Sequence, residues 1–489
     1  MTLNMKNLLS IFLFFTVISF TFNVPQVSAQ TSQSVEKKTT YKKARALQTS
    51  TAKRILKIVE ALEEVDDEGK EAPDVERALE ILNELYERKD SLKSYDRSVM
   101  WQYFGYIYLE REDYAKAKDA YEKLLVEPES TIPYRVAALF TLATLNFVDG
   151  NYQEGVNQLL QWMEEVETIT AQGWYLLAQG YYQLAEDKKT QSEKFDMFEK
   201  SIDSMLNAME TAELEGYKPK EGWYTLLAAL YSELKPRIGE QVALIKQQEI
   251  YEILVNLYPK KEYFIALGGI YAQQKRELDY MITLKAAYQK DFLNKESEYV
   301  ALTQLLLLNK NPYWAAKVLE SGRTKQVLTV VKEKNSRGAE VEKEVMLPVV
   351  KDTEKNLKLL ADAWRMAQEI DRAIPVLEQA AKLSKDGQTF IILGSLYLSV
   401  DKLEQAVDSF KNGLEKGKLA NISQARMALG QTYFELQRFE EAKKEFRIAA
   451  RDEDKKIKQT ANNWIKYTEN EEIRVKNIAL RRDYIQNQG

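Results

Sequence analysis

The sequence predicts an all-α fold, a right-handed superhelical solenoid of antiparallel helix hairpins, and three observations lead to this prediction. From residue 41 onward, apolar residues recur with a helical period and strand-like alternation is rare. A pattern of large and small residues repeats about every 34 residues. The 489 residues are 45% hydrophobic and 29% charged, so the chain can bury a large core beneath a polar surface. Repeated helix pairs of this kind bury their apolar faces by stacking on one another.

The best-formed repeat begins at Trp101 and shows how the pattern specifies a hairpin. Its first helix carries large residues three or four places apart, on the face that packs. Gly105 and Ala117 are small enough to let the two helices approach closely, and Tyr121 fills the space between hairpins. The complete pattern is Trp101, Phe104, Gly105, Tyr108, Ala117, Tyr121, Leu124 and Pro128. This spacing resembles that of the tetratricopeptide repeat (TPR), a helix hairpin of about 34 residues.

Further copies of the pattern cover most of the chain. Three consecutive copies toward the C-terminus have their small residue at Ala361, Gly394 and Gly430, so the repeat length is 33 and then 36 residues. Weaker copies fill the middle of the chain. Their wider spacing predicts lengthened loops near residues 186–194 and 235–241.

These patterns divide the chain into segments, one of which breaks the helical period. Residues 323–352 contain two β-branched runs around Asn335 to Gly338, which predicts a β-hairpin insertion; a disordered linker is the alternative. The edge of such a hairpin can receive a partner strand, or the hairpin can cover an adjacent surface. The predicted segments are a signal peptide (1–29), a flexible leader (30–40), an N-terminal TPR array (41–322), the insertion (323–352), a C-terminal TPR array (353–454), and a capping helix with a frayed tail (455–489).

The N-terminal segment has the parts of a secretory signal peptide. Lys6 supplies a positive charge, Leu8 to Phe22 is apolar, and Val27 and Ala29 are the small residues before a cleavage site at Gln30. An uncleaved membrane anchor is the alternative, but the apolar run is shorter than the ~20 residues that span a bilayer. No later segment is apolar enough to cross a membrane. We therefore expect a periplasmic protein whose mature chain has no membrane span.

Composition limits the chemistry that this chain can perform. It contains neither Cys nor His, which excludes disulfides, Cys/His zinc sites, Cys nucleophiles and Ser-His-Asp triads. An enzymatic alternative needs a cluster of carboxylates, and the repeats give no reason to expect one. We predict a non-enzymatic protein without cofactor or metal. Lys and Arg (69) are interleaved with Asp and Glu (74) for a net charge of -5, so a nucleic-acid partner is not expected.

Resemblance to TPR proteins identifies candidate binding residues. In that family, the first-helix residues one, five and eight places after the Trp position line a concave groove. The residues at these positions are mostly aromatic or weakly polar, which suits an extended peptide or an amphipathic helix. The alternative is that they belong to the core, as most aromatic residues at repeat positions do. The candidate groove residues are Gln102, Tyr106, Leu109, Phe140, Thr144, Phe147, Tyr175, Gln179 and Tyr182.

The later repeats differ at the same positions. The repeat from Leu357 places Lys358, Asp362 and Arg365 there. This set is not the Lys/Asn clamp with which cytosolic chaperone adaptors hold a terminal carboxylate. That role is therefore disfavoured.

The chain is similar to exported TPR proteins of Gram-negative bacteria. More narrowly, the helix pair expected at Ala46 to Val65 and Asp74 to Tyr86, the first full repeat, and Thr353 to Gly387 resemble the periplasmic TPR protein that accompanies TonB, ExbB and ExbD transport modules. This resemblance implies an adaptor in energised outer-membrane uptake whose partners are TonB, ExbB or ExbD components or an outer-membrane receptor. A second hypothesis is a cell-envelope assembly factor or periplasmic chaperone that binds outer-membrane or cell-wall proteins.

Overall fold

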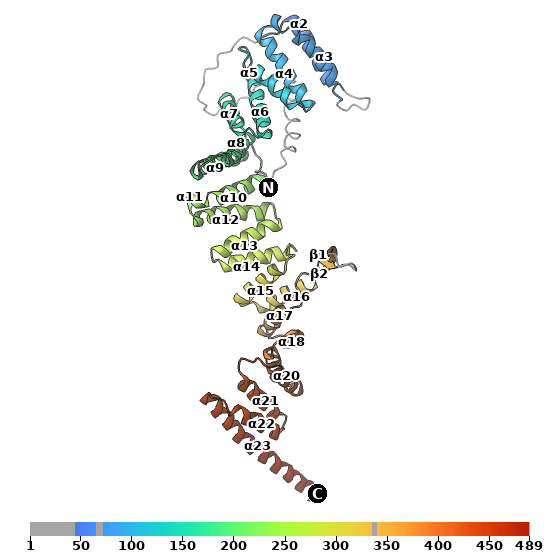
Figure 1. The fold of residues 1–489 in the computed structure, drawn as a ribbon, viewed down its shortest axis with the longest axis vertical. Helices are drawn as coiled ribbons and strands as arrows, with labels where there is room; N and C mark the ends of the chain where they lie inside the picture. The colour runs from blue at the N-terminus through green and yellow to red at the C-terminus, as the bar shows by residue number, and fades with distance from the viewer. Residues whose placement is uncertain (1–44, 65–71, 335–339, 489) are drawn as a thin grey trace, which may run out of the picture. The chain divides into compact units, whose positions relative to one another are not determined.

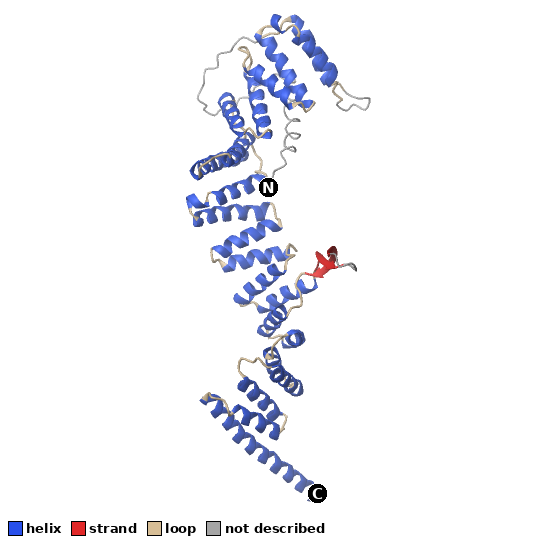
Figure 2. Cartoon of the chain, in the orientation of Figure 1, coloured by secondary structure: helices blue, strands red, loops and turns tan. Residues whose placement is uncertain are grey.

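The computed structural model describes residues 45–64, 72–334 and 340–488. They form helices and one pair of strands (Figures 1 and 2). The chain falls into two compact units, Met1–Ile250 and Tyr251–Gly489. Among the described residues, most consecutive helices pack together as hairpins, and most hairpins pack on the next. The predicted fold class, an all-α TPR solenoid, is confirmed.

The described part of the first unit is built from helices joined by short turns. Their bounds are α2 Thr49–Leu62, α3 Val75–Tyr86, the 3-10 helix η1 Lys89–Ser91, α4 Ser94–Glu110, α5 Tyr114–Leu125, α6 Ile132–Val148, α7 Tyr152–Glu165, α8 Ala171–Glu186, α9 Gln191–Leu214, α10 Glu221–Glu233, α11 Lys235–Ile238 and α12 Glu240–Leu257, in which the second unit begins. Helices α2 and α3 confirm the predicted N-terminal hairpin. Asp74 caps α3, because its carboxylate accepts a hydrogen bond from the backbone N–H of Arg77 at 2.9 Å.

The second unit continues the same architecture and contains the strands. Its elements are α13 Lys261–Gln273, α14 Glu277–Gln289, α15 Glu296–Leu308, α16 Pro312–Thr324, β1 Gln326–Lys334, β2 Glu340–Pro348, α17 Glu354–Met366, α18 Ile370–Leu383, α19 Gln388–Leu398, α20 Leu403–Lys416, α21 Ile422–Glu435, α22 Phe439–Ala449 and α23 Lys455–Gln488. The three C-terminal repeats predicted from sequence are the hairpins α17–α18, α19–α20 and α21–α22. Helix α23 packs on α22 and α21 as the predicted capping helix does.

Turns within the hairpins use the left-handed backbone region without requiring glycine. Gln437 (φ 55°) follows α21, and the next backbone N–H, that of Arg438, donates to the carbonyl of Tyr433 at 2.9 Å. At the end of α17, the N–H of Glu369 donates to the carbonyl of Trp364 at 2.9 Å in the same way. These bonds satisfy carbonyls that a helix end leaves without partners, so the chain can reverse direction within a few residues.

Small residues hold the helices of each hairpin at close range. A Cβ added at Gly105 would lie 2.5 Å from the ring of Tyr121, and one added at Gly394 would lie 2.8 Å from the ring of Phe410. Both rings are buried. The close approach of the two helices that was predicted at the small residue is confirmed at Gly105, and the structure adds that a large ring of the second helix packs against the small residue at both positions.

The insertion forms a β-hairpin, so the disordered-linker alternative is wrong. Strands β1 and β2 pair antiparallel from Gln326 opposite Pro348 to Lys334 opposite Glu340. The β-branched runs on either side of the turn supply the strand-forming residues. The predicted turn at 335–338, the signal peptide (1–29) and the leader (30–40) lie outside the described residues.

The lengthened loops predicted near residues 186–194 and 235–241 were wrong, because most of these residues form helices. Near residues 186–194, only a short turn separates α8 from the 24-residue α9. Thr190 and Glu193 form a capping box that starts α9, so the additional residues lengthen a helix instead of a loop. Near 235–241 the chain forms the short helix α11.

The charged segment after residue 470 is also helical, since α23 runs for 34 residues to Gln488. Ion pairs three and four residues apart support the helix here. Arg474 pairs with Glu471 at 2.5 Å, and Lys476 pairs with Glu472 at 2.8 Å. Charge in this segment therefore stabilises a helix, whereas the sequence analysis took it as a sign of a frayed tail.

Candidate protein-binding surfaces

The predicted groove residues lie on α4, α6 and α8, the first helices of three successive hairpins in the first unit. The structure divides them into two groups by exposure. Leu109 (6% exposed), Phe147 (4%) and Tyr175 (8%) are buried. The other six are half-buried, and we call them the first-helix face: Gln102, Tyr106, Phe140, Thr144, Gln179 and Tyr182.

For the buried residues, the expectation that they line an open groove does not hold, and the reason is steric. Gly155 on α7 and Gly180 on α8 leave room for the ring of Phe147, since a Cβ added at either glycine would lie 2.6 Å from it. Tyr175 stacks on Trp223 of α10, with ring centroids 4.9 Å apart. These side chains join neighbouring hairpins and are not available to a partner.

The half-buried residues have an anchored part and a part that reaches the surface. The ring of Phe140 lies 5.1 Å from that of Trp162. The ring of Tyr182 lies 5.9 Å from that of Phe198. Gln179 donates through Nε2 to the hydroxyl of Tyr175 at 3.1 Å. Because second-helix residues and neighbours fix these side chains, little conformational entropy is lost when a partner binds them.

The six residues of the first-helix face carry no formal charge, although Glu110, Glu186 and Glu233 lie close enough to interact with Tyr106 and Tyr182. Burial raises the pKa of Tyr175 to about 12, so the hydroxyl that meets Gln179 is protonated at neutral pH. Burial, together with Glu233 and Glu186, raises the pKa of Tyr182. Burial also raises the pKa of Glu110, while a hydrogen bond with Tyr106 acts in the opposite direction. Uncharged aromatic surface of this kind suits an apolar or amphipathic peptide.

Three further aromatic residues on α4 and α6 were not predicted as candidates from the sequence. Tyr95, Tyr103 and Tyr134 are half-buried against the core of the first unit. Burial raises the pKa of Tyr134 to about 12, and the nearby Tyr95 and Tyr103 act in the same direction. They occupy no consensus position of the repeat. The density of tyrosine between residues 95 and 108 is the signal that could have identified two of them.

A shallow pocket of about 430 Å³ lies on another part of the first unit. Its charges are largely paired within the pocket. Arg97 binds Glu127 with an N–O distance of 2.7 Å, and Lys89 donates to the hydroxyl of Tyr86 at 2.9 Å. Because the groups satisfy one another, the pocket does not favour a ligand of either charge. Its lining is Tyr86, Lys89, Asp90, Arg97, Trp101, Lys123, Val126 and Glu127.

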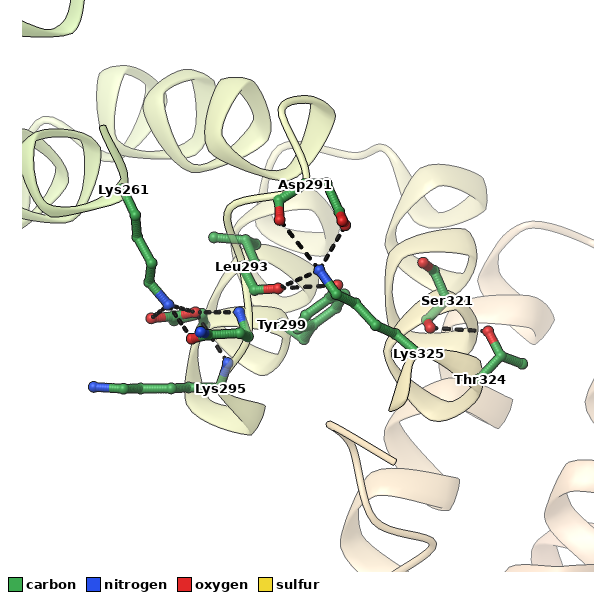
Figure 3. A network of polar contacts seen from close by, with 10 residues as sticks. Lys261, Asp291, Leu293, Lys295, Tyr299, Ser321, Thr324 and Lys325 are labelled. Carbon is green, nitrogen blue, oxygen red and sulfur yellow. Dashed lines mark hydrogen bonds and ion pairs between the residues drawn. The ribbon is translucent and has the colours of Figure 1, made fainter. Parts of the chain in front are cut away.

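In the second unit, the β-hairpin is fixed to the helices at its base (Figure 3). The ammonium of Lys325 donates to the carboxylate of Asp291 at 2.5 Å and to the carbonyl of Leu293 at 2.8 Å. The N–H of Val349 donates to the carbonyl of Lys325 at 2.9 Å, and Val350 is fully buried. Both ends of the hairpin are therefore anchored.

One face of the hairpin exposes apolar residues near the base. Leu328 lies opposite Met346, and both are more than half exposed; Val330, also exposed, lies opposite Glu344. The opposite face is partly buried, and Val327 packs against the core of the second unit. The hairpin is thus a second candidate surface, which combines exposed apolar side chains with strand edges.

Two kinds of site were searched for within the described ranges. No three Asp or Glu residues there come close enough to hold a metal ion. None of the described helices combines the length and apolar character needed to cross a bilayer.

Comparisons with known proteins find matches among solved structures only. No model of a known protein family matches the chain, and no curated protein matches it. Solved structures with similar helix hairpins include MamA, at 18% identity over 39% of this chain and 97% of that chain, with a TM-score of 0.30. A tetratricopeptide repeat protein from Parabacteroides merdae is 14% identical over 56% of this chain and 92% of that chain, with a TM-score of 0.32. The TPR2AB domain of yeast Sti1, solved in complex with pHSP90, is 12% identical over 61% and 97%, with a TM-score of 0.28.

Proposed function

We propose that this chain is a non-enzymatic protein-interaction scaffold in the periplasm, and that it acts as an adaptor of a TonB-dependent energy-transduction or outer-membrane uptake system. The observation that carries the scaffold role is the first-helix face. It places one aromatic and one uncharged polar residue on each of three successive first helices. Stacked hairpins present such residues along an extended surface, which is how repeat arrays bind protein segments.

The TonB assignment rests on sequence resemblance alone. The resembling segments are the N-terminal helix pair, the first full repeat, and Thr353 to Gly387. The export signal expected at residues 1–29 is consistent with a periplasmic location. In this proposal the partner is a TonB, ExbB or ExbD component or an outer-membrane receptor, and the first-helix face holds an extended or helical segment of it.

A pull-down from envelope extracts tests the assignment. The chain beginning at Gln30 is immobilised and exposed to extracts of the native host grown with and without iron, and bound proteins are quantified by mass spectrometry. The test variant is Tyr106→Ala with Tyr182→Ala. The matched control is Tyr217→Ala with Tyr313→Ala, because these tyrosines are exposed and lie outside the first-helix face.

The proposal predicts enrichment of TonB-system components that the test variant loses and the control variant keeps. Truncation of a binding aromatic residue usually costs more than 1 kcal/mol, so loss of two should reduce capture at least about tenfold. Enrichment of many unrelated outer-membrane proteins would instead support the assembly-factor or chaperone hypothesis. Suppression of aggregation of unrelated unfolded proteins would support that hypothesis independently.

A further inference from the structure

Helix α23 extends beyond the helices on which it packs. Its 34 residues span about 51 Å, whereas the 11 residues of α22 span about 17 Å. The buried ammonium of Lys443 on α22 donates to Glu472 at 2.7 Å, and Val475 is half-buried. From Lys476 to Asn487 every residue is exposed. The second half of the helix therefore lacks packing partners among the described residues of this unit (Figure 1).

This exposed half carries large apolar side chains. Ile478 is 37% exposed, Leu480 66%, Tyr484 63% and Ile485 62%. Ile478 and Ile485, seven residues apart, lie on one side of the helix, whereas Leu480 and Tyr484 lie on the other side. A helix that functions only in water gains nothing from them. Ile478 and Ile485 therefore leave exposed apolar surface on one side of the helix.

The spacing of residues on α23 indicates what shape of molecule fits. Residues alternately three and four places apart form one continuous stripe, which we call the α23 seam: Ala461, Trp464, Thr468, Glu471, Val475, Ile478, Arg482 and Ile485. Helices α21 and α22 cover the first half of the seam, where Ala461 and Thr468 are fully buried. The second half, from Val475, is left uncovered. Spacing of this kind is the signature of packing against another α-helix.

Charge indicates the chemistry of the missing helix. Arg474 and Lys476 are paired with Glu471 and Glu472. Among the described residues, Arg481 and Arg482 have no ion-pair partner. Arg474 and Arg481 are seven residues apart, so both flank the seam on the same side of it. Arg482 lies within the seam. Acidic side chains on an incoming helix would meet these guanidinium groups.

We propose that the uncovered half of the α23 seam, Val475 to Ile485, is a docking site for an acidic amphipathic helix of a partner protein. Ile478 and Ile485 provide the apolar contact, and Arg481 and Arg482, which have no ion-pair partner among the described residues, select a helix with acidic residues flanking its apolar stripe. This surface is distinct from the first-helix face and goes beyond the scaffold role proposed above.

Two other occupants fit the surface less well. In a parallel pair of identical helices, Arg482 of one copy would face Arg482 of the other; in an antiparallel pair, Arg474 and Arg481 would face their counterparts. Like charges at these positions oppose self-association. A helix lying on a lipid surface needs one apolar face and one polar face, whereas here Arg482 interrupts the apolar stripe and Leu480 lies on the opposite side.

The test uses the full chain and two designed fluorescent peptides of about three heptads. Both peptides carry Val and Leu at the core positions; the acidic peptide has Glu at the flanking positions, and the basic peptide has Lys. Fluorescence anisotropy gives the affinity of each peptide at low and at high salt. The variants are Arg481→Glu with Arg482→Glu, Ile478→Ser with Ile485→Ser, and the opposite-face control Leu480→Ser with Tyr484→Ser. Circular dichroism verifies that each variant keeps its helix.

We expect the acidic peptide to bind at least about tenfold more tightly than the basic one, with the preference weakened by salt. Charge reversal should invert the preference, the seam variant should bind neither peptide, and the opposite-face control should bind normally. Equal binding of the two peptides, or no binding of either, would overturn the proposal. So would binding to anionic phosphatidylglycerol vesicles without peptide binding, or dimerisation in sedimentation that the seam variant abolishes.

Discussion

The contact between Gly105 and Tyr121 offers a direct test of how the hairpins are packed. A Cβ added at Gly105 would lie 2.5, 2.6 and 2.8 Å from three ring atoms of Tyr121, whose side chain is buried. Overpacking such a site costs about 1–3 kcal/mol, and replacing a helical Gly by Ala returns about 1 kcal/mol of helix propensity. With three contacts this short, the cost falls in the upper part of its range. We therefore expect Gly105→Ala to lower the free energy of unfolding by about 1–2 kcal/mol.

Gly269 on α13 provides the matched control, because nothing lies within 4 Å of its added Cβ. Gly269→Ala should raise the local free energy of unfolding by about 1 kcal/mol. Hydrogen exchange read by mass spectrometry measures both effects in the peptides that cover each hairpin. A double variant, Gly105→Ala with Tyr121→Leu, should lose less stability than the sum of its single variants. Equal effects of the two Gly→Ala changes would refute the packing argument.

Two further predictions concern the second unit. Hydrogen bonds from Lys443 and Lys476 lower the pKa of Glu472 to about 2, below its ordinary value of 4.5. The ionised Glu472 carboxylate therefore stabilises the folded state above about pH 4.5, and this stabilisation is lost as the pH falls toward 2. Thermal melts should show Glu472→Gln less stable than wild type at pH 7, with a difference that shrinks toward pH 2; a difference independent of pH would contradict this. A Cβ at Gly387 would collide with the backbone carbonyl of Gly413, which cannot rotate away, so Gly387→Ala should cost about 3 kcal/mol. An unchanged urea midpoint would show that the loop can move aside.

Local rules in the sequence were sufficient for most of the fold. The small residues Gly105, Gly394 and Gly430 each admit a ring from the following helix, and this requirement repeats because every hairpin packs in the same way. The hairpin was predictable because two β-branched runs flank a turn sequence. In these cases, the residue types and their spacing were enough to predict the local structure, because contacts with distant parts of the chain do not change it.

The candidate site was harder to predict, because exposure depends on neighbours that are distant in sequence. Phe147 occupies a position expected to face the groove, yet Gly155 and Gly180 create the space that buries it. Tyr175 is buried because Trp223, from a later helix, stacks on it. The helical state of α23 beyond residue 470 was missed for a related reason: charge was taken as a sign of fraying, although Glu472 is bound by Lys443 of another helix.

The measurement that tests the central claim most directly is the affinity of the purified chain for the purified periplasmic region of TonB from the same host, by isothermal titration calorimetry. The account predicts saturable binding at a defined stoichiometry. It also predicts that Tyr106→Ala with Tyr182→Ala weakens the affinity at least about tenfold, whereas Tyr217→Ala with Tyr313→Ala leaves it unchanged. Absence of binding would contradict the TonB assignment, and binding that the first-helix variant retains would contradict the role of the first-helix face.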